Sequence, residues 1–367
     1  MILSIGKSLP PHCLLQTEAA TFAKRQFGPH FKNIDRLLPV FQSAEIDKRY
    51  FAMPLEWYSS GPTFEEKNEK YVSLSVEYAK EAILDCLNNP FYLNEMIDCR
   101  DIDAIFFVST TGISTPSIEA RIMNVLPFSP HTKRIPIWGL GCAGGAAGIA
   151  RANDYCLAHP DQAVLVVNVE LCSLTFQHGD FSKSNLIGTA LFADGISAVL
   201  LTGETSSLLR RSTLPSIPGI VATRSTLMRD SEDVMGWEVS NEGLHVVFSK
   251  SIPAIVSSWL EPNVLEFLSI QEKTTQEIDY FIAHPGGTKV LTAYEEALGF
   301  DKSMTAVSRN VLKEYGNMSS VTVIYVLDQF LRNGCKHGHL GLMAALGPGF
   351  CSELLLLEWK KEHKKWG

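Results

Sequence analysis

The sequence has few charged residues and no excess of basic ones. Only 20% of its 367 residues are charged, and 32 basic residues against 40 acidic ones give a formal net charge of −8. Nucleic-acid binding depends on a basic surface that contacts phosphates. The chain has one basic cluster, which we interpret as a solvated end: Lys360, Lys361, Lys364 and Lys365. We therefore expect no nucleic-acid partner.

Long apolar runs and a targeting segment are also missing. The longest uncharged stretch, residues 135–150, contains Pro136 and five glycines. Its 16 residues are fewer than the roughly 20 that span a bilayer. Residues 1–6 carry neither a basic region nor a cleavage pattern, so no signal peptide is predicted. Because 46% of the chain is hydrophobic, we expect a folded, soluble, cytoplasmic protein without stable membrane insertion.

Eight cysteines are present, but none of them forms a C-x-x-C pair. A zinc site or a disulfide framework is therefore not expected, and reduced thiols suit the cytoplasm. The sequence also has no G-x-x-x-x-G-K-[ST] loop for phosphates and no H-E-x-x-H zinc motif. We predict a protein without a bound metal or cofactor.

Apolar periodicity predicts where helices and strands lie. Helical spacing indicates a helix over residues 65–88, which the Asn88-Asn89-Pro90 sequence ends. The first hundred residues as a whole look mostly helical. Short apolar runs predict buried strands further along, at residues 104–108, 164–167, 198–201, 280–283 and 341–346. Strands that are apolar throughout indicate an α/β protein, with helices on both faces of its sheets.

Strands and helix starts recur at a nearly constant offset along the chain. An acidic residue followed by Ile and Asp precedes a strand at residue 101 and again 176 residues later, at residue 277. Cys142 and Asn317, 175 residues apart, each begin a helix after a glycine turn. We infer two similar halves, residues 1–215 and 216–367, although the order strand-helix-strand also recurs by chance in α/β chains.

Cys142 is the candidate nucleophile. It follows a strand predicted at residues 134–138 and the turn Gly139-Leu140-Gly141, and it opens a helix rich in glycine and alanine. Backbone N–H groups and the positive helix end point at the sulfur there, and both favour the reactive thiolate. A buried structural cysteine is the alternative, and we assign that role to the other cysteines apart from Cys172.

Two further residues are placed to meet Cys142 in a cleft. His284 ends the strand predicted at residues 280–283 and precedes Pro285-Gly286-Gly287, where a side chain faces the edge of a sheet. Asn317 occupies in the second half the place that Cys142 occupies in the first. If the halves pack about a twofold axis, all three residues converge. Taken singly, His284 suits a core or surface histidine, and Asn317 suits a helix N-cap.

Four motifs in this order resemble the type III polyketide synthases, the chalcone and stilbene synthase family of the thiolase-like superfamily. They lie at residues 141–145 (Gly-Cys-Ala-Gly-Gly), 282–287 (Ile-Ala-His-Pro-Gly-Gly), 316–320 (Gly-Asn-Met-Ser-Ser) and 347–349 (Gly-Pro-Gly). The resemblance covers nearly the whole chain and is closest to bacterial alkylpyrone synthases. It implies a thiolase-like αβαβα fold of five layers and a homodimer.

The resemblance also implies a reaction. Cys142 takes the acyl group of a medium- or long-chain acyl-CoA, and malonyl-CoA loses CO₂ to supply the enolate that extends it. His284 and Asn317 donate hydrogen bonds to that enolate. Repeated Claisen condensation and ring closure give alkylpyrone-type triketides and tetraketides. Acyl-CoA and malonyl-CoA are then the partners, and no cofactor is needed.

The same motifs imply a substrate pocket. Phe192 resembles the gatekeeper phenylalanine of the family, and four residues match positions that shape its cavity: Cys172, Thr175, Gly243 and Ser319. A loop that carries an aromatic residue in plant enzymes corresponds here to Leu346, Gly347 and Pro348.

Two departures from the plant pattern suggest room for a long acyl starter. Leu346 replaces the aromatic residue of that loop, and Thr115 stands where plant enzymes carry a methionine that crosses the dimer interface. Nearer the N-terminus, two basic residues either approach CoA phosphates or form a solvated helix end: Lys48 and Arg49.

Two other functions fit part of the pattern. A β-ketoacyl-carrier-protein synthase III of fatty acid synthesis also uses Cys, His and Asn, but its extender is bound to a carrier protein. The motifs at residues 316–320 and 347–349 favour the polyketide synthase. A non-catalytic thiolase-like partner subunit would only shape a cavity. Such proteins generally lose the cysteine, so the presence of all three residues argues against it.

Overall fold

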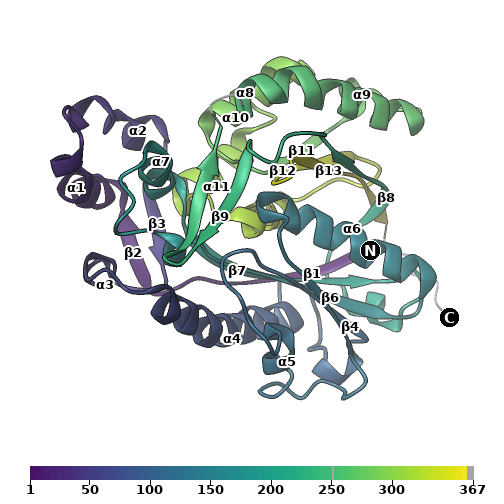
Figure 1. The fold of residues 1–367 in the computed structure, drawn as a ribbon. Helices are drawn as coiled ribbons and strands as arrows, with labels where there is room; N and C mark the ends of the chain where they lie inside the picture. The colour runs from purple at the N-terminus through teal and green to yellow at the C-terminus, as the bar shows by residue number, and fades with distance from the viewer. Residues whose placement is uncertain (250–251, 362–367) are drawn as a thin grey trace.

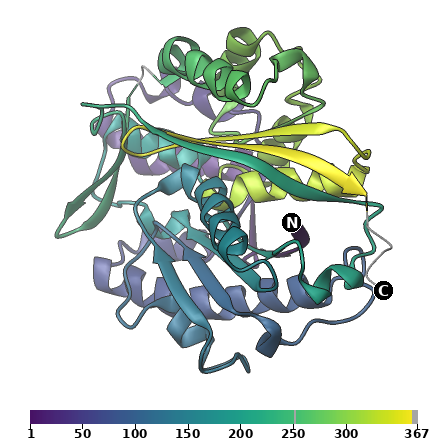
Figure 2. The same ribbon diagram turned by 90° about the vertical axis from the view of Figure 1, so that its right-hand side faces the viewer.

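Two large β-sheets with helices between and outside them form the centre of the computed structural model, which describes residues 1–249 and 252–361 (Figures 1 and 2). Lys364 and Lys365 of the basic cluster lie outside the described residues. Figure 2 shows the layers from the side: helices, a sheet, central helices, a second sheet and a further layer of helices. This is the predicted five-layer αβαβα arrangement.

The first sheet has the strand order β1-β7-β6-β4-β5. Strand β6 runs parallel to β4 and antiparallel to β7, and β7 in turn pairs antiparallel with β1. All residues of β6 and β7 are buried, as expected for strands covered on both faces. The five strands are β1 (Ile2–Ser8), β4 (Ala104–Val108), β5 (Lys133–Ile137), β6 (Ala163–Leu171) and β7 (Asp194–Thr202).

The second sheet repeats most of this pattern. Its order is β8-β13-β12-β11, where β13 pairs antiparallel with β8 and β12, and β12 runs parallel to β11. The order and the directions match those of β1-β7-β6-β4, which confirms two similar halves. The division after residue 215 stays a prediction. The strands are β8 (Ser216–Leu227), β11 (Tyr280–Ala283), β12 (Leu340–Gly347) and β13 (Cys351–Lys361).

Helices α6 (Gly144–Ala158) and α12 (Thr322–Asn333) lie between the sheets. The small residues of α6 permit this position, as the sequence predicts. A Cβ on Gly145 would stand 2.1 Å from the Ser320 carbonyl oxygen, and one on Gly148 would stand 2.8 Å from Val166. The close approach fixes the N-terminal end of α6 against the second half of the chain.

Other helices cover the outer faces of the sheets (Figures 1 and 2). The predicted helix is α4 (Phe64–Asn88), which begins with a capping box between Thr63 and Glu66 and lies along the first sheet beside α5 (Ile118–Ile122). The second sheet is covered by α8 (Ile252–Ile255), α9 (Glu261–Ile270) and α10 (Thr288–Leu298).

Helices cover most of the first hundred residues, as predicted, but the region also contains strands that were not predicted. Strand β1 begins the first sheet, and β2 (His12–Leu15) pairs with β3 (Lys48–Phe51). Strand β1 alternates apolar residues with Ser4, Gly6 and Lys7, and its partner β7 lies nearly 200 residues away, so no local pattern reveals it. The remaining helices of this region are α1 (Gln16–Phe27), α2 (Pro39–Ser43) and α3 (Leu55–Ser59).

One end of the molecule gathers segments that surround the candidate site (Figure 1). They are α1, β3, α7 (Lys183–Leu191), α11 (Ala306–Tyr315) and the hairpin of β9 (Met235–Ser240) and β10 (Gly243–Phe248). Within residues 1–249 and 252–361, no helix is long and apolar enough to cross a membrane, and no cluster of three His, Cys, Asp or Glu side chains is arranged to hold a metal ion.

Candidate active site

Cys142 lies in a short 3₁₀ turn, Gly141–Ala143, between β5 and α6. The helix itself begins at Gly144, so the cysteine stands just before it rather than at its first residue. Gly141 has φ +48°, and its N–H donates to Thr110 Oγ1 at 3.1 Å. The cysteine side chain is buried, and the turn is therefore a fixed support for its sulfur.

Residues 139–144, around Cys142, have the sequence G-L-G-C-A-G. This sequence matches the G-x-G-x-x-G pattern of dinucleotide-binding turns. Here two of these glycines pack against other segments of the protein. A Cβ on Gly141 would meet Pro348 at 2.7 Å, and one on Gly347 would meet the Leu140 carbonyl oxygen at 2.3 Å. The glycines therefore serve the close packing of the 347–349 loop against the cysteine turn.

His284 follows the last residue of β11 and remains tied to the sheet. Its N–H donates to the Ala344 carbonyl at 2.8 Å, and its carbonyl accepts from Gly286 N–H. The imidazole is buried, and neither ring nitrogen has a hydrogen-bond partner among the described residues. A buried polar ring without partners is available to a substrate oxygen.

Asn317 contacts Cys142 and the loop that follows His284. Its side-chain amide donates to the Gly286 carbonyl at 3.2 Å, next to His284, while its Oδ1 accepts from Ser319 N–H at 2.8 Å. The Cys142 thiol also points at Oδ1, with the sulfur 3.9 Å away. Asn317, in the turn before α12, thus lies against Cys142 in the β5–α6 turn and against the loop that follows β11 and His284.

Burial controls the protonation of this group. It raises the pKa of Cys142 to about 12, against a hydrogen bond from Ser319, and the Glu170 carboxylate adds to the rise. It lowers the pKa of His284 to about 3. Burial therefore opposes the thiolate that the end of the helix favours. A proton moved from sulfur to imidazole creates two opposite charges that stabilise each other.

Glu170 is a buried carboxyl group beside the site that sequence reasoning missed. Its oxygens accept from Ser320 Oγ at 2.7 Å and from Thr110 N–H at 3.1 Å. Burial raises its pKa to about 7, although these hydrogen bonds oppose the rise. The available signal was one acidic residue in the strand at residues 163–171, where Asn168 is the other polar residue.

Phe192 directly follows α7, two residues before β7 begins, and is held between Asn317 and the β9–β10 hairpin. The Ala193 N–H donates to the Asn317 carbonyl, and the Asn317 N–H donates to the Leu191 carbonyl, both at 2.9 Å. The Phe192 ring lies 5.5 Å from that of Phe248 and 6.1 Å from that of Trp237. Sequence reasoning missed both aromatic partners, because nothing local links a hairpin near residue 240 to Phe192.

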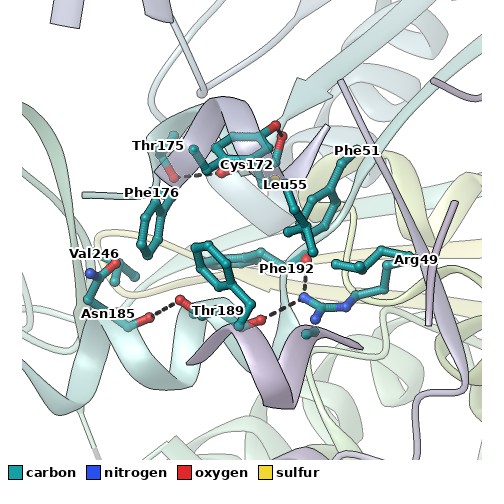
Figure 3. A pocket seen from close by; sticks show the side chains of 16 residues that line it. Arg49, Phe51, Leu55, Cys172, Thr175, Phe176, Asn185, Thr189, Phe192 and Val246 are labelled. Atoms are coloured by element: carbon teal, nitrogen blue, oxygen red, sulfur yellow. Dashed lines mark hydrogen bonds between the residues drawn. The ribbon is translucent and has the colours of Figure 1, made fainter. Parts of the chain in front are cut away.

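A small apolar pocket lies behind Phe192 (Figure 3). Three of the predicted residues line it, Cys172, Thr175 and Phe192, and its volume is about 40 Å³. Figure 3 shows Phe192 in the middle of the pocket, with Phe176 and Val246 on one side and Arg49 on the other. Apolar side chains form most of the wall, among them Leu14, Phe22, Phe51 and Leu55.

The other predicted pocket residues lie elsewhere. Gly243 begins β10 with φ +130° and packs against Gln177 and Phe64. Ser319 lies beside Cys142 and Asn317. The remaining three residues follow one another at the end of β12 and in the loop that packs on the cysteine turn: Leu346, Gly347 and Pro348.

Arg49 is completely buried, so it does not approach CoA phosphates on the surface. It also lies on strand β3, and the alternative of a solvated helix end is therefore wrong. Lys48 is partly exposed, and its Nζ lies 3.1 Å from Glu314.

Residues 1–205 match the family profile described as the N-terminal domain of "Chalcone and stilbene synthases". Residues 219–359 match the profile of the C-terminal domain of the same family. A Bacillus subtilis (strain 168) protein named "Putative chalcone synthase" is 51% identical over 98% of this chain and 99% of its own. The 1,3,6,8-tetrahydroxynaphthalene synthase of Streptomyces peucetius is 35% identical over 98% and 93%. The crystal structure of the Streptomyces coelicolor enzyme of that name, a bacterial type III polyketide synthase, superposes with a TM-score of 0.88, at 29% identity, over 98% and 99% of the two chains.

The link between His284 and Cys142 is testable by alkylation. Burial holds Cys142 as a neutral thiol in the unliganded site, so its attack on iodoacetamide needs a base that accepts the proton, and His284 is the candidate. We expect His284→Ala to slow the reaction of Cys142 with iodoacetamide at least about tenfold, because a positioned general base typically contributes more than that. Mass spectrometry of the Cys142 peptide measures the rate.

His159→Ala is the matched control for this experiment, because His159 lies in the loop after α6, at the opposite end of that helix from Cys142. It is expected to react like the unmodified protein. Equal rates for His284→Ala and the unmodified protein would show that His284 does not accept the thiol proton.

Proposed function

The chain belongs to the chalcone and stilbene synthase family, the type III polyketide synthases, and on that premise we propose that it extends medium- or long-chain acyl-CoA with malonyl-CoA to form alkylpyrones. As a member of this family it is an acyl-transferring, condensing enzyme. One observation supports the proposal most directly: the Cys142 thiol points at Asn317, the Asn317 amide binds the loop after His284, and the backbone of Asn317 pairs with residues 191–193, which carry the pocket residue Phe192.

The first step loads the starter onto Cys142. As the acyl-CoA thioester binds, the thiol proton passes to the neutral imidazole of His284, and the sulfur attacks the thioester carbonyl. A new carbon–sulfur bond forms on Cys142 and the bond to CoA breaks. The imidazolium then returns the proton to the departing CoA thiolate, which leaves His284 neutral again.

The second step forms the carbon–carbon bond. Malonyl-CoA loses CO₂, and the electron pair of the broken bond becomes an enolate. His284, with a proton on Nε2, and the second amide hydrogen of Asn317 donate to the enolate oxygen, and such donors are each worth roughly 10²–10³ in rate. The carbanion attacks the acyl thioester, the Cys142 thiolate leaves, and the chain is two carbons longer. Because decarboxylation supplies the electron pair, we propose that the step needs no cofactor.

Asparagine suits the second position because its amide donates without titrating in the range of an enzyme. An acidic hydrogen at the same place would protonate the enolate before condensation. After the extended chain returns to Cys142 and the cycle repeats, attack of an enol oxygen on the thioester closes an α-pyrone and frees the cysteine.

The preference for an alkyl starter is supported by the pocket behind Phe192. Its wall is mostly apolar, and Gly188 contributes no side chain to it. Its volume of about 40 Å³ is far below the roughly 300–1,000 Å³ of ordinary ligand pockets. A long acyl chain therefore enters only when side chains such as Phe192 move aside.

We also propose a homodimer in the cytoplasm. Ile113 and Trp138 are 48% and 54% exposed at one apolar groove, and the loop that holds Ile113 also holds Thr115. Eight unpaired thiols suit a reducing compartment. Sedimentation velocity is expected to give twice the chain mass of 40.6 kDa, and Trp138→Asp is expected to shift the protein toward the single-chain mass. A single-chain mass for the unmodified protein contradicts the dimer.

Product analysis tests the reaction itself. Purified protein with malonyl-CoA and a series of acyl-CoA starters is expected to give triketide and tetraketide pyrones, detected by mass spectrometry, with the highest yield from medium or long chains. Cys142→Ala is the control and is expected to give none. The absence of extended product with every starter would refute the proposal. Extension by malonyl-carrier protein and not by malonyl-CoA would indicate the ketoacyl synthase III reaction instead.

A second experiment tests the role of the pocket. Cys172→Phe places a ring beside Phe192 in the cavity, so we expect kcat/KM for long starters to fall about 10-fold or more while short starters keep theirs. Cys13→Phe is the matched control, because Cys13 is exposed on β2. An unchanged starter preference in Cys172→Phe would show that the acyl chain lies elsewhere.

A further inference from the structure

We propose that Arg49 is a positioning residue for the condensation step: from the floor of the pocket it holds the backbone that carries Phe192 and pairs with Asn317. The inference rests on the proposed function, since it concerns the step in which Asn317 acts. It assigns a role within the site to a residue whose side chain is inaccessible to solvent.

The Arg49 guanidinium binds the end of α7. Its Nη1 donates to the Thr189 carbonyl at 2.8 Å and to the Phe192 carbonyl at 2.6 Å (Figure 3). The last carbonyls of a helix have no partner within it and carry its negative end, so a cation there is favourable. Arg49 therefore closes α7 and sets the direction in which the chain leaves it.

The segment that leaves α7 is held along both of its edges. On one edge, the Leu191 carbonyl and the Ala193 N–H pair with the backbone of Asn317, both at 2.9 Å. On the other edge, the Phe192 carbonyl accepts from Arg49. Because the backbone is extended at Phe192, neighbouring carbonyls point to opposite sides. Residues 191–193 thus connect the guanidinium of Arg49 to Asn317.

The stem of Arg49 also contacts the residue before Asn317. Gly316 has φ +72°, and a Cβ there would stand 2.7 Å from the Cγ and Cδ atoms of Arg49. Arg49 therefore touches the asparagine turn directly and through residues 191–193. A shift of its side chain acts on Asn317 by two routes.

Strand β3 is itself fastened to the same region. Asp194, two residues after Phe192, accepts from the Ala52 N–H at 2.6 Å and from the Ser173 N–H at 2.6 Å. Both Arg49 and Asp194 are buried, and the arginine provides a favourable charge for the aspartate. The strand that carries Arg49 consequently cannot drift away from the segment it supports.

Stability alone does not account for this arginine. A buried charge is unfavourable unless it is paired, and replacing it by an apolar residue is often neutral or stabilising. Two of its nitrogens, Nε and Nη2, have no hydrogen-bond partner within residues 1–249 and 252–361. Its Nη1 donates to the carbonyls of Thr189 and Phe192, and Phe192 lies between the two residues that pair with Asn317. A displacement of about 1 Å at a reacting group costs about 100-fold in rate.

The test separates the two half-reactions. In Arg49→Met, acylation of Cys142 by acyl-CoA, followed by mass spectrometry in single turnover, is expected to stay within about threefold of the unmodified rate, because it depends on Cys142 and His284. Extension by malonyl-CoA, started from the acyl-enzyme, is expected to fall about 10- to 100-fold. Arg49→Lys keeps one donor and the charge and should recover part of the extension rate.

The control for general destabilisation is Arg332→Met. Arg332 on α12 binds the buried Asp328 at 3.0 Å and lies outside the site. Its loss is expected to lower the melting temperature while the ratio of the two half-reactions stays unchanged. If Arg49→Met is too unstable to purify, the same ratio measured for Arg49→Lys decides.

The possible outcomes are distinct. An equal fall in both half-reactions, or an extension rate that matches the unmodified protein, would overturn the role of Arg49. Failure of the unmodified protein to extend any acyl-enzyme with malonyl-CoA would instead refute the proposed function. Loss of extension alone, with recovery by lysine, would support Arg49 as a positioning residue.

Discussion

The pairing of Asn317 with residues 191–193 is the contact on which the site depends, because it joins the two halves of the chain at the reacting groups. Its two backbone hydrogen bonds connect the turn before α12 with the start of β7. The same turn receives the Cys142 thiol from one side and the loop after His284 from the other. Three segments from distant parts of the sequence therefore all contact the turn that holds Asn317.

Dense packing around this point has a chemical consequence. Glycines at positions 141, 145 and 347 let neighbouring segments approach closely around the buried Cys142 and His284. The sulfur and the imidazole are consequently driven toward their neutral forms when each is considered alone. In the proposed reaction the proton of Cys142 therefore passes to His284 as substrate binds. The reactivity of Cys142 consequently depends on an occupied site.

The sequence predicts those parts of the structure that depend on local pattern. The strands at residues 104–108 and 280–283, the helix at residues 64–88 and the repeat of two halves follow from apolar spacing and glycine turns. What it misses depends on contacts between distant segments. Arg49 meets the Phe192 carbonyl across more than 140 residues, and the rings of Trp237 and Phe248 reach Phe192 only because a hairpin folds back.

Strand β1 has a consequence for how the chain assembles. Its residues pair with β7 in a register that sets Ile2 against Leu201, and the terminal amino group donates to the Thr202 carbonyl. During synthesis the first strand therefore emerges long before its partner exists, and the first sheet cannot close until β7 has left the ribosome. Contacts of such long sequence separation slow folding. Until β7 is available, the apolar side chains of β1 are covered either by the helices that follow it in the chain or by a chaperone.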